Sequence, residues 1–136
     1  MKRVFVDSGG FFAHLVSEDP LHLRASELFL QAEGEGWHLA TTNAVVFETH
    51  ALLTNRAREG REAGIRFLEQ IERGFCEIVR VTQDDEARAT AILRDHQDKA
   101  YSFCDALSFV VMERLGAAEA IAFDRHFREY GKFTIL

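Results

Sequence analysis

The chain has 136 residues, close to the size of one domain and enough for a hydrophobic core that needs no disulfide or metal support. Hydrophobic residues make up 47% of the sequence and charged residues 28%, a composition that excludes a disordered chain and a small disulfide-rich scaffold. The net charge of −6 excludes nucleic-acid binding driven by the overall field, so such a role needs a local basic patch, a metal ion or a basic partner.

In chain order, we expect strand Arg3–Val6, helices Phe11–Val16 and Leu21–Glu33, strand Trp37–Thr41, helices Ala44–Arg56 and Arg61–Arg73, strand Phe75–Val81, helices Asp84–His96 and Phe103–Leu115, strand Ala118–Phe123, a short helical turn, and strand Phe133–Leu136. Four glycines follow predicted helices and are expected to end them: Gly34, Gly60, Gly74 and Gly116. This alternation of strands and helices predicts a parallel sheet covered on both faces.

No linker or repeat interrupts the pattern, so we expect a single domain over residues 1–136. No apolar run reaches the ~18 residues of a membrane span, and Asp7 interrupts the stretch that a signal peptide would continue. We therefore expect a cytoplasmic protein with no membrane partner. Cys76 and Cys104 lack metal-binding spacing and are expected to be buried free thiols.

Four acidic residues occupy positions that a parallel sheet would bring together. Asp7 and Asp124 directly follow predicted strands, and ligands of such sheets bind at the carboxyl ends of the strands. Glu48 lies on an apolar stripe of its helix, and Asp105 lies in the first turn of the Phe103–Leu115 helix.

Each acid also has a structural explanation. Asp7 and Asp124 would serve as N-caps, and Ser102 with Asp105 matches a capping box. Glu48 would pair with Arg56 or Arg58. These explanations give no reason for acids to stand at two strand exits and on two apolar helix faces together.

Four carboxylates in one cleft would repel one another and raise their pKa values unless a cation neutralises them. Because no histidine or cysteine joins the set, the ligands are all oxygen and favour Mg²⁺ or Mn²⁺ over zinc. The predicted chemistry is hydrolysis of a phosphodiester by metal-activated water, without a covalent enzyme intermediate.

Four stretches of the sequence resemble the PIN domain family, and within it the small toxins of bacterial VapBC toxin–antitoxin pairs. They are Val4-Phe-Val-Asp-Ser-Gly-Gly-Phe-Phe-Ala13, Thr41-Thr-Asn-Ala-Val-Val-Phe-Glu-Thr-His50, Ser102-Phe-Cys-Asp-Ala-Leu-Ser108 and Ala120-Ile-Ala-Phe-Asp-Arg-His-Phe127. The resemblance implies a three-layer α/β/α sandwich whose central parallel sheet has four or five strands. It also implies a Mg²⁺- or Mn²⁺-dependent endoribonuclease that forms a homodimer and is silenced by an antitoxin protein.

The family's acids fall on Asp7, Glu48, Asp105 and Asp124, and the resemblance makes these four the catalytic residues. It assigns the metal to Asp7, Asp105 and Asp124, with Glu48 binding directly or through water. Ser8 and Ser102 would support these ligands through hydrogen bonds. Phe11, Phe12 and Leu15 lie near the predicted site and would either face the antitoxin or belong to the core.

Arginines near the predicted site are candidates for RNA contact, because guanidinium groups bind phosphates in a bidentate manner. We single out Arg56 and Arg58 beside the Gly60 turn, and Arg125 and His126 after Asp124. Interspersed Glu59 and Glu62 are compatible with an ordinary solvated surface.

Two other readings of the acids remain open: a PIN-domain nuclease of RNA processing that has no antitoxin, and a PIN-like module that binds RNA or protein without cutting. A haloacid-dehalogenase-type phosphotransferase is disfavoured because the second acid of its Asp-x-Asp motif would fall on Gly9. A response-regulator receiver is disfavoured because Ser8 replaces its second acid and no lysine is suitably placed.

Overall fold

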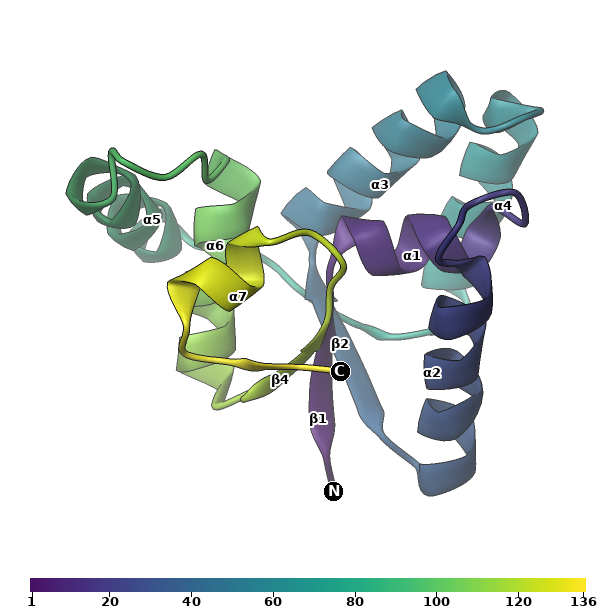
Figure 1. The fold of residues 1–136 in the computed structure, drawn as a ribbon, viewed down its shortest axis with the longest axis horizontal. Helices are drawn as coiled ribbons and strands as arrows, with labels where there is room; N and C mark the ends of the chain where they lie inside the picture. The colour runs from purple at the N-terminus through teal and green to yellow at the C-terminus, as the bar shows by residue number, and fades with distance from the viewer.

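The computed structural model describes all 136 residues and contains one five-stranded sheet with helices on both faces (Figure 1). In chain order its elements are β1 (Arg3–Val6), α1 (Ser8–Leu15), α2 (His22–Glu35), β2 (His38–Thr42), α3 (Asn43–Arg56), α4 (Gly60–Glu72), β3 (Glu77–Val79), α5 (Gln83–Asp95), α6 (Phe103–Leu115), β4 (Glu119–Ile121), α7 (His126–Tyr130) and β5 (Thr134–Ile135).

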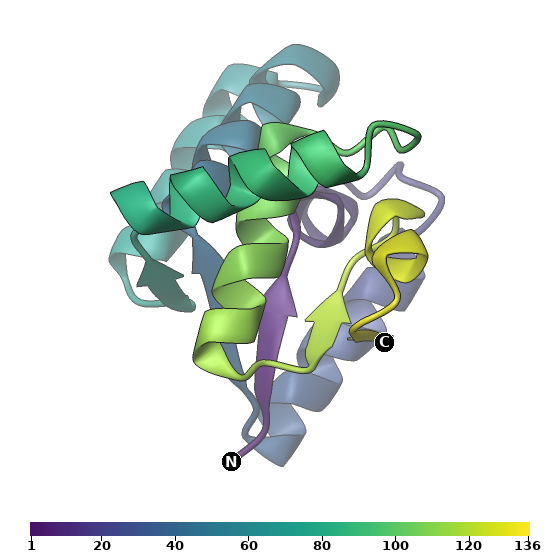
Figure 2. The same cartoon turned by 90° about the vertical axis from the view of Figure 1, so that its left-hand side faces the viewer.

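The strands are arranged β3-β2-β1-β4-β5, and each neighbouring pair is parallel. Two views at right angles show α1, α2 and α4 on one face of the sheet and α5, α6 and α7 on the other (Figures 1 and 2). The predicted three-layer α/β/α sandwich is therefore confirmed, with five strands in its sheet.

The centre of the sheet is β1, whose Val4, Phe5 and Val6 are completely buried. Their continuous apolar run is typical of a strand covered on both faces. At the carboxyl end, the Thr41 hydroxyl donates a 2.7 Å hydrogen bond to the Val6 carbonyl, and Thr42 caps α3 through Val45 N. These bonds fix β1 and β2 at the same edge, where α1 and α3 begin.

Helix α1 begins at Ser8, three residues before the predicted start. A Cβ at Gly10 would lie 2.9 Å from both the side chain and the carbonyl oxygen of Ile121. Glycine therefore lets α1 pack directly on the end of β4, and this contact outweighs its low helix propensity. Phe11 is 1% exposed and contacts Phe29 and Phe67, so it belongs to the core and not to a partner surface.

Two of the predicted helix ends are wrong. Helix α2 continues through Gly34 to Glu35 and is capped by Gly36, which has a positive φ of 68°. Gly60 begins α4 and packs so closely on the Leu53 carbonyl of α3 that a side chain would collide with it. Gly74 and Gly116 follow α4 and α6 with positive φ, as predicted. No helix is both long and apolar enough to cross a membrane.

Candidate metal centre

Asp7 is a buried carboxylate with one oxygen atom that has no hydrogen-bond partner in the chain. It directly follows β1 and precedes α1, yet its side chain makes no capping hydrogen bond. The residue is 2% exposed, and its Oδ1 atom is buried without any hydrogen-bond partner. The N-cap explanation of Asp7 is therefore wrong. Burying such an oxygen costs free energy unless a proton or a cation compensates.

Asp105 and Asp124, in contrast, accept hydrogen bonds from backbone N–H groups at the starts of helices α6 and α7. The Oδ2 atom of Asp105 accepts a 2.9 Å hydrogen bond from the Ser102 backbone N–H, and the Ser102 hydroxyl accepts one from Asp105 N. The Oδ1 atom of Asp124 accepts a 2.9 Å bond from His126 N. Asp124 lies three residues beyond the end of β4, because that strand ends at Ile121 and not at Phe123. These hydrogen bonds fix the orientation of both carboxylates.

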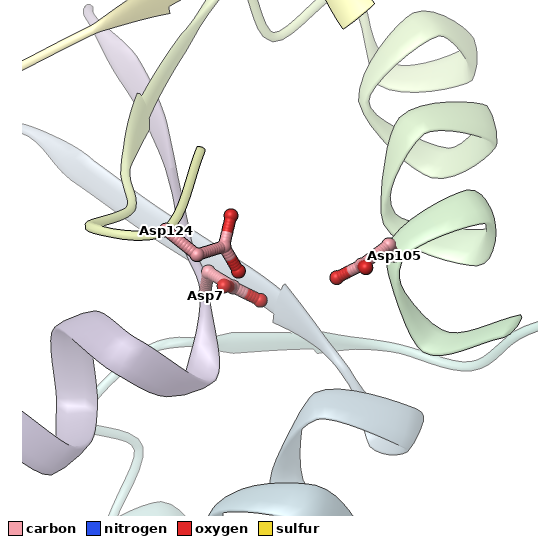
Figure 3. Close-up of side chains that lie close together, drawn as sticks. All are labelled: Asp7, Asp105 and Asp124. Atoms are coloured by element: carbon pink, nitrogen blue, oxygen red, sulfur yellow. The ribbon is translucent and has the colours of Figure 1, made fainter. Parts of the chain in front are cut away.

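The three aspartates converge at the carboxyl edge of the sheet. Figure 3 shows Asp105 on α6 pointing across the edge toward Asp7 and Asp124. One carboxylate oxygen of each residue lies within 4.8 Å of the others, and Asp124 is the most accessible of the three. Three distant segments of the sequence thus place negative oxygens around one point.

The cluster is electrostatically unfavourable on its own. Burial, followed by the charges of Asp124 and Asp105, raises the pKa of Asp7 well above its ordinary value, and the Ser8 backbone N–H offsets this only in part. Burial also raises the pKa of Asp105, and Asp124 adds to the rise against the hydrogen bonds of Ser102 and the charge of His126. The site therefore favours binding of a proton or of a positive ion.

Glu48 lies beside this cluster but outside the group of three mutually close oxygens. It is partly buried on α3, and its Oε1 atom accepts a hydrogen bond from the Ser8 hydroxyl. Its charge contributes to the raised pKa of Asp7. Neither Arg56 nor Arg58 pairs with it, so the proposed structural pairing of Glu48 is wrong.

The predicted RNA-contact residues fall into two places. Arg125 and His126 stand at the start of α7, where Arg125 Nε lies 3.9 Å and His126 Nδ1 3.5 Å from the Glu129 carboxylate. His126 is close enough to Asp105 for its charge to lower the pKa of that residue. Arg56 is the last residue of α3, eight residues beyond Glu48, and Arg58 follows the end of that helix.

Cys104 is a neighbour of the site that the sequence did not single out. Burial and the charges of Glu48, Asp7 and Asp105 all raise the pKa of its thiol. It is a free, partly buried thiol, whereas Cys76 is a free, fully buried one. The only signal in the sequence was its position next to Asp105.

Comparison with known proteins agrees with this geometry. The sequence profile of the PIN domain family matches residues 4–133. The 23S rRNA-specific endonuclease VapC20 of Mycobacterium tuberculosis, from strains CDC 1551 / Oshkosh and H37Rv, is 32% identical to this chain over 128 residues, which cover 94% of each protein.

Solved structures share the fold. The crystal structure of M. tuberculosis VapC20, described as a Sarcin-Ricin loop cleaving toxin, aligns with a TM-score of 0.87 at 32% identity over 95% of each chain. VapBC2 from Rickettsia felis, bound to a DNA fragment from its promoter, aligns over 98% of this chain and 97% of its own with a TM-score of 0.67 at 11% identity, a likeness of fold alone. Because the family match spans nearly the whole sequence, the chain belongs to the PIN domain family.

Proposed function

We propose that this protein is a divalent-metal-dependent endoribonuclease and the toxin of a toxin–antitoxin pair, acting in the cytoplasm. The observation that carries the proposal is the buried, unpartnered Oδ1 of Asp7 beside the carboxylates of Asp105 and Asp124. The relative that is 32% identical over 94% of the chain supports large-subunit ribosomal RNA as the first substrate to test.

The residues of the cluster fit a hard divalent cation. Three carboxylates supply only oxygen ligands, which suit Mg²⁺ or Mn²⁺ better than zinc. Asp7, Asp105 and Asp124 would hold the ion. Once bound, such an ion lowers the pKa of a water molecule and stabilises negative charge on a phosphodiester oxygen.

The chain's own side chains have distinct parts in this function. Hydrogen bonds from the backbone N–H groups of Ser102 and His126 hold the carboxylates of Asp105 and Asp124 in place before any ligand arrives. Glu48, held by the Ser8 hydroxyl at the edge of the cluster, is placed to accept the proton of the attacking water. The open side of the site, at Asp124, would receive the RNA backbone.

Cleavage of purified large-subunit ribosomal RNA tests this proposal. We expect specific cuts in Mg²⁺ or Mn²⁺, none in EDTA, and none by Asp7→Asn in either ion. Asp84→Asn is the matched control, because Asp84 is an exposed aspartate that pairs only with Arg88. Metal-independent cutting, or full activity of Asp7→Asn, would overturn the assignment.

An antitoxin partner is supported by an unoccupied apolar groove of about 700 Å³ between α2 and the entry to β3. Exposed Leu30 and Phe75 line it together with Glu33, which forms no ion pair, and this combination suits a basic, amphipathic protein segment. Expression of the chain alone should arrest growth, and Asp124→Ala should relieve the arrest. Leu30→Glu should weaken neutralisation by the product of the neighbouring reading frame, unlike Leu23→Glu on the same helix.

A homodimer is supported by two exposed aromatic residues on helices that pack together. Phe47 on α3 is 64% exposed and Phe103 on α6 is 42% exposed. Such residues are enriched in protein interfaces. Sedimentation should give the mass of a dimer for the unmodified chain and of a monomer for Phe47→Glu. A monomeric unmodified chain would refute this assembly.

A further inference from the structure

Unpaired positive charge is concentrated at one place on this acidic protein. Of its 16 lysines and arginines, ten form ion pairs with carboxylates and six do not. Three of those six lie at the junction of α3 and α4: Arg56 ends α3, Arg58 lies in the connection, and Arg61 is in the first turn of α4. All three are exposed, and none donates a hydrogen bond within the chain.

The segment that carries these arginines is held firmly. Gly60 packs on the Leu53 and Thr54 carbonyls of α3, where any side chain would collide. Glu59, just before it, adopts a left-handed conformation with a φ of 52°, which is uncommon for a residue other than glycine. The arginines therefore project from a fixed turn, which reduces the entropy that a bound ligand must overcome.

This turn forms a groove with the end of α1. A cavity of about 350 Å³ is lined by Leu15 and Ser17 from the α1 side and by Arg58 and Arg66 from the α4 side. Glu18 and Glu59 also line it, but no carboxylate pairs with Arg56, Arg58 or Arg61. Arg66 pairs with Glu62, so the groove keeps the Arg58 guanidinium available to an incoming anion, and the unpaired Arg56 and Arg61 flank it along the chain.

Helices α1 and α3 connect this groove to the acidic cluster. They are joined at the cluster, where the Ser8 hydroxyl donates to Glu48, they contact each other, and Leu15 and Ala57 near their far ends line the same groove. Eight residues separate Glu48 from Arg56, a rise of about 12 Å along a helix. A stacked nucleic-acid strand covers that distance in roughly three to four base steps at ~3.4 Å each.

We propose that Arg56, Arg58 and Arg61 bind the phosphate backbone of the RNA strand whose scissile bond lies at the acidic cluster. The inference rests on the proposed nuclease function and adds the direction in which the substrate runs, along α1 and α3. Guanidinium groups suit bidentate phosphate contacts, which position a strand without reading its sequence. Because the whole chain carries a charge of −6, the attraction depends on a local group of cations, and three of the six unpaired ones gather at this turn.

Binding of RNA at a series of salt concentrations tests the proposal. Binding is measured without cleavage in two ways: with chains that also carry Asp7→Asn, and with chains that keep Asp7 in the presence of EDTA. The ligands are a single-stranded RNA oligonucleotide and a polyglutamate peptide of equal charge. The doubly substituted Arg56→Ala/Arg58→Ala chain is compared with Arg80→Ala/Arg94→Ala, which removes two unpaired arginines elsewhere.

We expect the Arg56/Arg58 variant to bind RNA at least about tenfold more weakly at 0.1 M salt. The slope of log K against log salt should fall by about 1.4, because each contact to a single strand contributes roughly 0.7. The Arg80/Arg94 variant should keep both affinity and slope, and the melting temperatures of the two should agree.

Equal RNA affinity in both variants would overturn the proposed binding of RNA by the arginines of this turn. Cleavage of RNA by the unmodified chain would in that case leave the nuclease assignment intact. Tighter binding of polyglutamate than of RNA at the turn would overturn the proposed RNA binding in favour of an acidic protein. If the unmodified chain neither binds nor cleaves RNA, both the proposed RNA binding at the turn and the nuclease assignment are overturned.

Discussion

Two helices of this protein begin with the same local motif and place it in opposite electrostatic surroundings. Helices α5 and α6 both start with a complete capping box, formed by Thr82 with Asp85 and by Ser102 with Asp105. Both aspartates are buried, at 1% and 6% exposure. Two hydrogen bonds of 3.0 and 2.6 Å from Arg114 reach Asp85, whereas Asp105 faces Asp7 and Asp124.

The two carboxylates respond in opposite directions. Burial acts to raise the pKa of Asp85, but the hydrogen bonds from Arg114 and Thr82 outweigh it and hold the pKa below the ordinary value. Burial and Asp124 raise the pKa of Asp105. One aspartate has its counter-charge within the chain, and the other lacks one. This difference is the basis for proposing that the first serves the fold and the second serves a ligand.

The largest expected effect is a contrast between the two aspartates: substitution of Asp105 should lower activity, and substitution of Asp85 should lower stability. Asp105→Asn should lower RNA cleavage at least ~100-fold, since even changes around metal ligands cost 10- to 100-fold, while the fold keeps its stability. Asp85→Asn should destabilise the protein and leave the rate per folded molecule nearly unchanged. Cleavage rates and urea denaturation of both variants check this. Loss of activity in Asp85→Asn at full folding would remove the distinction.

The next largest effect is expected from substitution of Arg114, the ion-pair partner of Asp85. Arg114→Met should reduce the free energy of unfolding by about 2–3 kcal/mol, because it leaves the Asp85 carboxylate buried without a counter-charge. This lies below the usual cost of breaking a buried pair, since the Arg114 side chain is 41% exposed and water screens it. In a chain of this length the melting temperature should fall by roughly 7–10 °C. A change below 1 °C would show that the pair does not stabilise the fold.

The positions of the acidic residues and the capping boxes could be predicted from the sequence. The pairing of Asp85 with Arg114, which separates it from Asp105, could not. Strand exits placed Asp7 and Asp124 at one edge of the sheet, because parallel strands end together. The capping box of Asp105 was read from Ser102-x-x-Asp105, and Thr82-x-x-Asp85 has the same form. Nothing local distinguishes the two, since Arg114 lies 29 residues beyond Asp85.

Packing decided the features that the sequence did not reveal. The late predicted start of α1 was wrong because contact with Ile121, rather than helix propensity, favours Gly10. Phe11 was open between core and surface until α2 and α4 supplied Phe29 and Phe67. The hydrogen bond from Ser8 to Glu48 spans 40 residues, so only the folded chain reveals it.

The pH dependence of stability sharpens the comparison through its sign. The pKa values of Asp7 and Asp105 are higher in the folded chain than in the unfolded one, so protonation of these groups stabilises the fold. This stabilisation is fully present below their ordinary pKa near 4 and is lost as the pH rises through their raised pKa values. The pKa of Asp85 is lower in the folded chain than in the unfolded one, so its ionised carboxylate stabilises the fold. This stabilisation is present at pH values above its ordinary pKa and is lost as the pH falls through its lowered pKa. In EDTA, the unmodified chain should therefore lose stability relative to Asp7→Asn as the pH rises above 4.

Urea denaturation of both chains at several pH values measures that difference. Comparing the chains removes the contribution of His14, whose pKa is lowered by burial and by His22 and which acts with the opposite sign. Saturating Mn²⁺ should abolish the loss. A difference that does not change with pH would contradict the raised pKa of Asp7.

The smallest effect concerns the support of Glu48. Ser8→Ala removes the hydroxyl that donates to its carboxylate and should slow cleavage about tenfold, the equivalent of roughly 1.4 kcal/mol. Binding of Mn²⁺ should stay nearly unchanged, because Glu48 stands outside the three mutually close carboxylates. Ser26→Ala, which removes a hydroxyl beside His14, is the control. Equal rates in both variants would remove Ser8 from the site.

Calorimetric titration of Mn²⁺ into the metal-free protein tests the central claim most directly. We predict saturable binding by the unmodified chain and by Arg114→Met below its melting temperature, and none by Asp7→Asn or Asp105→Asn. Binding should also raise the free energy of unfolding by about 2.7 kcal/mol when free Mn²⁺ reaches a hundred times its Kd. No heat of binding at millimolar Mn²⁺, or equal binding by Asp7→Asn, would contradict the account.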